Sequence, residues 1–238
     1  MSVGENVKYR WQKLTDELIG KKGYFFIDTT IHSFFIVIKK YIEKYAKGIV
    51  LDAGAGRLAL KFLLTKRACV YYSIDRHIAR KELSSIGDLN KMPFKEKIFD
   101  TIVCLQVIEH TPTPEIVIKN LADSLKDKGI LILSAPHISY LHGEPEDYYR
   151  YTKYGLFYML NKYGFRVLEI NAAGSIFSFL FTPISDFILS YTYGIPIVFQ
   201  ITFFLNSLFV QIISRIDLFL FKNSIMPANY ILAAERIR

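Results

Sequence analysis

The sequence predicts an α/β fold built on a mostly parallel sheet, and two observations carry that prediction. Short apolar, β-branched runs such as Ile49–Leu51 recur along the chain, as is typical of strands buried on both faces. Helical patterns of apolar residues alternate with these runs, which indicates right-handed crossovers between parallel strands. Ligands of such sheets bind at the carboxyl ends of the strands, so we expect the functional residues there.

The stretch from Gly48 to Leu60, G-I-V-L-D-A-G-A-G-R-L-A-L, combines a strand, a glycine turn and the start of a helix. Asp52, Gly54 and Gly56 form the turn, and apolar residues then resume at helical spacing. Glycines allow the backbone to approach a ligand without a Cβ in the way. This context suits a nucleotide-binding turn, although two glycines are also compatible with a tight turn that binds nothing.

A second predicted strand, Val70–Ile74, ends at Asp75, which lies 23 residues after Asp52. An acid about 20 residues beyond the glycine turn is placed to accept both hydroxyls of a ribose. The alternative is that a strand-terminal aspartate caps the helix that follows.

Three further segments follow in order: Gly87-Asp88-Leu89, the strand pattern Phe99–Leu105, and Gln106-Val107-Ile108-Glu109-His110. With these motifs the chain resembles the class I S-adenosylmethionine-dependent methyltransferases. It is most similar to their type-11, quinone-biosynthesis-like branch, which is marked by L-D-x-G-x-G, G-D-x-x-x-x-P-F and a strand ending in I-E-H. The resemblance covers about residues 48–171. It implies a Rossmann-like, seven-stranded, mostly parallel sheet with an antiparallel last strand and helices on both faces.

The resemblance also implies S-adenosyl-L-methionine as cofactor and S-adenosyl-L-homocysteine as product. The cofactor-binding residues that it implies are Asp52, Gly54, Gly56, Asp75, Arg76, Asp88, Leu89, Gln106 and His110. In this assignment Gly54 and Gly56 underlie the amino-acid part of the cofactor, Asp75 holds the ribose hydroxyls, and Asp88 holds the adenine. The chain departs from the family at Leu58, where a third glycine is usual.

The segment His137–Thr152, after the predicted fifth strand Gly129–Leu133, is dense in polar and aromatic side chains. Its run D-Y-Y-R-Y-T recurs in the resembled branch as a wall of the acceptor pocket. Transfer to a hydroxyl, as O-methylation requires, needs a base with a pKa near neutrality, and histidine fits best. The predicted catalytic residues are therefore His137 and His142, with His110 as a third candidate base.

Arg150 is predicted to grip an anionic acceptor, or alternatively to pair with a nearby acid: Glu144, Glu146 or Asp147. No cluster of histidine, cysteine and aspartate residues shows metal-ligand spacing, so the sequence predicts no metal site. The two cysteines, Cys69 and Cys104, are expected to be buried and reduced.

An apolar insertion of 57 residues, 172–228, separates the predicted sixth strand from the last strand, Asn229–Glu235. A hairpin connection here normally needs about 2–5 residues. The predicted helices Ile176–Tyr193 and Ile195–Ile213 each gather their polar residues on one face. Amphipathic helices with broad apolar faces suit a membrane interface better than a bilayer crossing. A dimer interface or an extra helical layer on the core is the alternative.

The sequence therefore predicts three parts: N-terminal helices at 1–47 that form a cofactor lid, a methyltransferase core at 48–171 and 229–238, and the insertion at 172–228. No signal peptide is expected, because no basic region followed by an apolar run begins the chain. The insertion's four charged residues sum to zero, so the whole net charge of +8 lies on the rest of the chain. That charge favours an anionic membrane surface.

We predict an enzyme that transfers a methyl group, by O- or C-methylation, to a lipid or lipid-linked acceptor. It would act in the cytoplasm, peripheral to the inner membrane face, which it would contact through residues 176–221. One alternative is a soluble small-molecule acceptor with the insertion as a homodimer interface. Another is a degenerate cofactor-binding scaffold at the membrane. Nucleic acid is not expected as a partner, because an N-P-P-Y-type motif is missing after the fourth strand.

Overall fold

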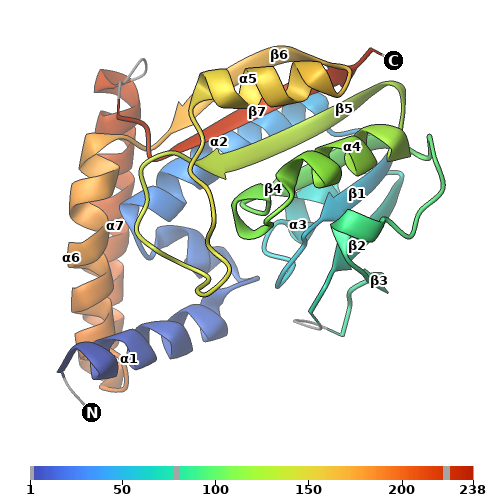
Figure 1. Cartoon of the computed structure of the whole chain (residues 1–238). Helices are drawn as coiled ribbons and strands as arrows, with labels where there is room; N and C mark the ends of the chain where they lie inside the picture. The colour runs from blue at the N-terminus through green and yellow to red at the C-terminus, as the bar shows by residue number, and fades with distance from the viewer. Residues whose placement is uncertain (1–2, 78–80, 222–225, 238) are drawn as a thin grey trace. The chain divides into compact units, whose positions relative to one another are not determined.

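The computed structural model describes residues 3–77, 81–221 and 226–237 (Figure 1). The chain divides into two compact units. One unit, Val37–Asn171 with Asn229–Arg238, holds the sheet, and the other, Met1–Ile36 with Ala172–Ala228, is helical. The insertion thus shares a unit with residues 1–36, whereas residues 37–47 belong to the sheet unit. The cofactor-lid role of residues 1–47 stays a prediction.

The sheet has seven strands in the order β3-β2-β1-β4-β5-β7-β6. Their bounds are β1 Ile49–Ala53, β2 Val70–Asp75, β3 Ser85–Ile86, β4 Phe99–Leu105, β5 Leu125–Pro136, β6 Phe165–Ala173 and β7 Asn229–Arg236. Strand β1 pairs in parallel with β2 and β4, β4 pairs in parallel with β5, and β7 is antiparallel to β5. This confirms the predicted Rossmann-like, mostly parallel sheet with an antiparallel last strand.

Both faces of the sheet are buried. The helices of this unit are α3 (Lys61–Leu64), α4 (Pro114–Ser124), α5 (Lys153–Lys162), the short turns η2 (Leu89–Lys91) and η3 (Ile108–His110), and the second part of α2 (Thr29–Tyr45). Leu51, Ile102 and Leu131 belong to one core cluster with residues of α4 and α5. Their neighbours along the strands, such as Val50 and Val103, point to the other face and are equally buried. Such continuous apolar runs are what a parallel sheet covered on both faces requires.

One prediction about the cysteines is wrong. Cys104 in β4 is buried, but Cys69 is exposed. Cys69 directly precedes β2, and the outer neighbour of β2 is the two-residue strand β3, which pairs with Ile74 and Asp75. Among the described residues, no strand therefore covers the outer side of the beginning of β2.

The helical unit contains α1 (Val3–Leu18), η1 (Lys22–Phe26), the first part of α2, α6 (Ile176–Thr192) and α7 (Pro196–Leu220). Helices α6 and α7 lie side by side, and α1 contacts α6 (Figure 1). Both predicted helices of the insertion are present, and the second extends beyond its predicted end at Ile213 to Leu220.

Polarity in α6 and α7 is inverted relative to a water-soluble helical layer. Most of the side chains that they bury are polar: Ser178, Ser185 and Ser190 on α6, and Asn206, Ser214 and Asp217 on α7. Most of their exposed large side chains are apolar, among them Leu180, Ile184, Phe187, Ile201, Phe204, Leu205, Ile212 and Phe219. A soluble helix normally buries its apolar stripe and exposes the polar one. The outer faces of this pair are therefore suited to an apolar environment.

Several of the buried polar groups are hydrogen-bonded to each other, to Ile27 and to Thr29 at the start of α2. The hydroxyl oxygens of Ser185 and Ser190 have no hydrogen-bond partner among the described residues. The Asp217 carboxylate accepts bonds from the backbone N–H groups of Ser175 and Phe177 and from Ser178 Oγ, at 2.6, 3.1 and 2.6 Å. These donors lie at the start of α6, where a carboxylate stabilises the free N–H groups of a helix. Asn206 Nδ2 donates to the Ile27 carbonyl at 2.8 Å, and Ser214 Oγ to that of Thr29 at 3.1 Å. The polar interior thus holds the helices in register.

Two carboxyls of this unit make its stability depend on pH. Burial raises the pKa of Asp28 to about 6, and burial together with the charge of Asp28 raises the pKa of Asp186 to about 9. An acid with a raised pKa in the fold stabilises it only while protonated. That contribution is complete below the unfolded pKa of about 4. It is then lost as the pH rises towards 9.

We therefore expect Asp186→Asn to raise the free energy of unfolding relative to the wild type at pH 8, and to raise it much less at pH 5. Urea denaturation at the two pH values measures the difference. Asp127→Asn is the control, because Asp127 is exposed and its pKa is lowered beside Lys97, so its contribution is constant over this range. An equal effect of Asp186→Asn at both pH values would contradict the expectation.

Candidate functional site

The glycine turn lies at the carboxyl end of β1. The backbone N–H groups of Gly54 and Ala55 both donate to the Ile74 carbonyl of β2, at 2.9 and 3.0 Å. Gly54 has a φ of +75°, and a Cβ there would lie 2.3 Å from Val107 Cγ2, so only glycine fits. A Cβ on Gly56 would meet nothing within 4 Å. The turn thus packs closely on one side and leaves space for a ligand beside Gly56.

Asp75 lies directly beside this turn. Its Oδ2 accepts the N–H of Gly56 at 2.9 Å, and its Oδ1 accepts the N–H of His77 at 3.0 Å. The structure therefore brings the predicted ribose-binding acid and the predicted glycines together at the ends of adjacent strands.

Asp52 is buried at the end of β1 and accepts a hydrogen bond from the Tyr71 hydroxyl at 2.9 Å. Burial, together with the neighbouring Asp75 carboxylate, raises the pKa of Asp52 to about 7. A cationic group that approached this carboxyl would favour its ionised form and bind it more tightly. A sulfonium or an α-amino group has the charge that this site would attract.

Leu58, at the position of the usual third glycine, adopts the backbone conformation that glycine favours. Its φ is +60°, in the left-handed region. For a residue with a side chain this conformation costs about 1–2 kcal/mol. Leu58 is also buried, and burying a leucine side chain contributes about 1.5–3 kcal/mol, which offsets the strain. Although leucine stands at the position of the usual third glycine, the backbone there therefore keeps the left-handed conformation.

The remaining predicted cofactor residues lie after β3 and β4. Asp88 Oδ1 caps the turn η2 by accepting the N–H of Asn90 at 2.9 Å, which is the capping role that a strand-terminal aspartate was also expected to have. Leu89 is buried. Gln106 has a φ of +55° and donates from both its backbone N–H and Nε2 to Ser134 Oγ. Their contacts with adenine and with the methionine end of the cofactor stay predictions.

The segment of residues 137–152, which is predicted to line an acceptor pocket, is joined to the end of β2 by an ion pair. The Arg76 guanidinium, which follows Asp75, donates to both carboxylate oxygens of Glu146. Arg150 forms a bidentate pair with Asp147, at 2.6 and 2.7 Å, which holds the pKa of that carboxyl well below its usual range. Of the alternatives for Arg150, the structure contains the local ion pair, and contact with an anionic acceptor stays a prediction.

The three candidate histidines are oriented in the same way. Each Nδ1 faces a backbone carbonyl: that of Tyr151 for His137 at 3.0 Å, Glu146 for His110 at 2.6 Å, and Tyr140 for His142 at 3.0 Å. A carbonyl can only accept, so each Nδ1 carries the proton and each Nε2 a lone pair when the ring is neutral.

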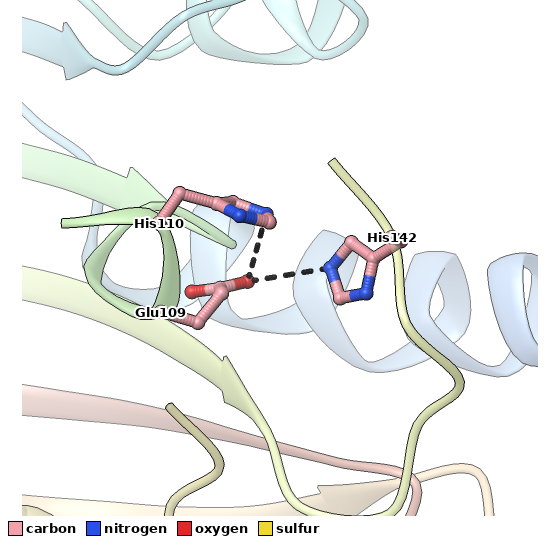
Figure 2. Close-up of side chains that lie close together, drawn as sticks. All are labelled: Glu109, His110 and His142. Carbon is pink, nitrogen blue, oxygen red and sulfur yellow. Dashed lines mark ion pairs between the residues drawn. The ribbon is translucent and has the colours of Figure 1, made fainter. Parts of the chain in front are cut away.

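His110 and His142 converge on Glu109, whereas His137 does not belong to this cluster (Figure 2). Both Nε2 atoms lie 3.9 Å from Glu109 Oε1. Glu109 raises the pKa of His142, whereas burial lowers the pKa of His110. This group cannot be predicted from the sequence, because His142 does not follow Glu109 and His110 at a spacing typical of metal ligands. The adjacent pair Glu109-His110 is the local signal that the sequence contains.

A sequence profile described as a methyltransferase domain matches residues 5–170. A ubiquinone biosynthesis O-methyltransferase of Coxiella burnetii is 29% identical over 138 residues, which cover 51% of this chain and 56% of that protein. The chain spans about half the length of the curated relatives that it matches.

Solved structures share the fold. An S-adenosylmethionine-dependent methyltransferase from Archaeoglobus fulgidus superposes with a TM-score of 0.55 at 14% identity, covering 84% of this chain and 94% of the other. The 1,6-didemethyltoxoflavin-N1-methyltransferase of Burkholderia thailandensis, solved with S-adenosylhomocysteine, gives 0.52 at 12% identity, covering 85% and 76%.

Removal of the carboxylate in Asp75→Ala should weaken S-adenosylhomocysteine binding at least about 100-fold, because two hydrogen bonds to a charged group are lost at about 1.5–3 kcal/mol each. Isothermal titration calorimetry measures the affinity. Asp88→Ala, which removes a cap outside the glycine turn, is expected to weaken binding less. Undiminished affinity in Asp75→Ala would remove the ribose assignment.

Proposed function

Because the chain belongs to the methyltransferase domain family, we propose that it transfers the methyl group of S-adenosylmethionine to a lipid or lipid-linked acceptor. The transfer would take place at the cytoplasmic face of the membrane, with the helical unit as a peripheral anchor. The observation that carries the membrane part of this proposal is the inverted polarity of α6 and α7.

The glycine turn and its surroundings support cofactor binding. Gly56 leaves room beside an acidic pair, Asp52 and Asp75, which suits a cation that also carries ribose hydroxyls. Alignment of the sulfonium methyl with the attacking atom supplies much of the rate in such a transfer. The protein's task is therefore mainly to position the two reactants and to exclude water.

A hydroxyl acceptor needs a base, and the geometry favours His137 over His142 for that role. His137 donates its Nδ1–H to Tyr151 and lies outside the Glu109 cluster, so its Nε2 lone pair is not directed at that carboxylate. The Nε2 of His142 faces Glu109 instead. The relatives' name, an O-methyltransferase of ubiquinone biosynthesis, supports a hydroxyl on a lipid-like acceptor.

The arrangement of the helical unit favours a position in the membrane interface over a crossing. Within the described ranges, α7 is the helix that is long and apolar enough to cross a membrane, and 17% of its most apolar window is buried. However, Tyr193, at the turn between α6 and α7, donates a hydrogen bond to Glu17 of α1. Helix α1 also carries Lys8, Arg10 and Lys13. A spanning hairpin would carry this charged helix through the bilayer, which is costly.

The acceptor class can be tested by incubating the full-length protein with methyl-labelled S-adenosylmethionine and a membrane extract of its own cells, and then partitioning the products. Label in the organic phase is the expected result, with Asp75→Ala as the inactive control. Label confined to the aqueous phase would favour the soluble acceptor instead. Loss of label with His137→Ala, in a variant that still binds S-adenosylhomocysteine, is expected if His137 is the base.

The membrane contact predicts a loss of liposome flotation when charge is placed on α7. Ile201, Leu205 and Leu208 are exposed on one face of α7, and their joint replacement by glutamate should reduce binding at least about 100-fold, because each apolar side chain contributes about 1.5–3 kcal/mol on burial. Vesicles that contain anionic phospholipid are the probe.

Tyr158→Glu, on the exposed face of α5 in the other unit, is the matched control and should float like the wild type. Retained S-adenosylhomocysteine binding shows that each variant is folded. The triple variant could instead float like the wild type and be a monomer where the wild type is a dimer. In that case α7 forms a subunit interface and the membrane proposal is wrong.

A further inference from the structure

We propose that Glu109, His110 and His142 bind one divalent transition-metal cation, of the class of Zn²⁺, Mn²⁺ or Fe²⁺. The proposal departs from the sequence prediction of no metal site. It does not depend on the identity of the acceptor, although a role of the cation in methyl transfer rests on the proposed function.

The first observation is a buried carboxylate without a hydrogen-bond partner among the described residues. The Glu109 side chain is 0% exposed, and among the residues that the structure describes neither of its oxygens has a hydrogen-bond partner. A buried carboxylate is normally paired, protonated or bound to a metal, because an isolated buried charge is very unfavourable. Tyr148 and Tyr149 donate their backbone N–H groups to the Glu109 carbonyl, which fixes the residue but leaves its carboxylate unsatisfied.

The second observation is the orientation of the two histidines. Glu146 and Tyr140 hold the Nδ1–H of His110 and His142 through their carbonyls, so both Nε2 lone pairs face Glu109 (Figure 2). A backbone carbonyl bound to the far ring nitrogen is the usual support of a metal-binding histidine, because it fixes both the tautomer and the ring orientation.

The distances suit a cation between the three groups. The ligand atoms lie within 4.8 Å of one another, and each Nε2 is 3.9 Å from Glu109 Oε1, too far for a hydrogen bond. Ligands about 2.0–2.2 Å from a tetrahedral metal lie about 3.4 Å from each other. A small inward shift of the three side chains therefore completes the coordination.

The arginines near this carboxylate pair with other acids, and its ion-pair partners among the described residues are His110 and His142, which carry a charge only when protonated. Arg150, the nearby cation, is already held in the bidentate pair with Asp147. Arg76 is held by Glu146. A bound cation would supply the positive charge that neither arginine gives to Glu109.

Two imidazoles and one carboxylate select a transition metal over Ca²⁺ or Mg²⁺, which prefer oxygen ligands alone. Three protein ligands also leave a coordination position open, as in catalytic sites. The His142 side chain is 38% exposed, so water or a substrate oxygen can reach this position. On the proposed acceptor, such a cation would lower the pKa of a hydroxyl that binds it.

The test is cation binding by the full-length protein, purified without a histidine tag and treated with a chelator. Equilibrium dialysis with Zn²⁺ should give one cation per chain, and Co²⁺ should produce the visible absorption of a low-symmetry site. Glu109→Gln and His142→Asn should each lower the affinity at least about 100-fold, since even loss of a residue that only supports a ligand costs about 10–100-fold.

His137→Asn is the matched control. Its Nδ1 also binds a backbone carbonyl, but it lies outside the cluster, so cation affinity should be unchanged. Because Glu109→Gln can disturb folding, the half-exposed His142→Asn provides a second variant, and S-adenosylhomocysteine binding reports the fold of both. Absence of stoichiometric binding by the wild type, or wild-type affinity in His142→Asn, would overturn the proposal.

The outcomes are separable from those of the proposed function. Cation binding without label in any lipid would leave the metal site in place and remove the acceptor class. Lipid methylation by a protein that binds no cation would support the acceptor class and remove the metal site.

Discussion

The site depends on the hydrogen bonds that join the glycine turn after β1 to the end of β2. Gly54 and Ala55 donate to Ile74, and Gly56 donates to Asp75. These bonds place the backbone of one strand end against the carboxylate of the next, which parallel pairing of β1 and β2 makes possible. Because the bonds lie at the edge of a sheet buried on both faces, the core holds the turn in position before any ligand arrives.

The helical unit follows a different rule. In the sheet unit, apolar burial supplies the cohesion. The helical unit has an apolar cluster around Leu14, Ile27 and Leu189, but polar contacts of Asp217, Asn206, Ser178 and Ser214 also join α6 and α7 to their neighbours. Polar contacts of this kind keep their strength where the surroundings are apolar, because no water competes for them. An interior of hydrogen bonds beneath an apolar surface is consistent with a unit that works in contact with lipid.

The sequence predicts much of the sheet and the cofactor edge, because the information is local. A β-branched run predicts a buried strand, and the spacing from Gly54 and Gly56 to Asp75 follows from one βαβ unit. The exposure of Cys69 could not be predicted in this way, because it depends on the length of a neighbouring strand. The meeting of Glu109 with His142 is likewise set by the path of residues 137–152, which no periodicity describes. The polar face of α6 was visible in the sequence, but the partners of Asp217 were not, since they lie about 40 residues away.

Glu146 is the point at which the two sides of the site meet. Its carboxylate binds Arg76, the residue after Asp75, while its carbonyl binds the Nδ1 of His110. One residue therefore links the loop after Asp75 to the cluster of Glu109, His110 and His142. A displacement of its backbone would change the ion pair with Arg76 and the orientation of the His110 ring at the same time.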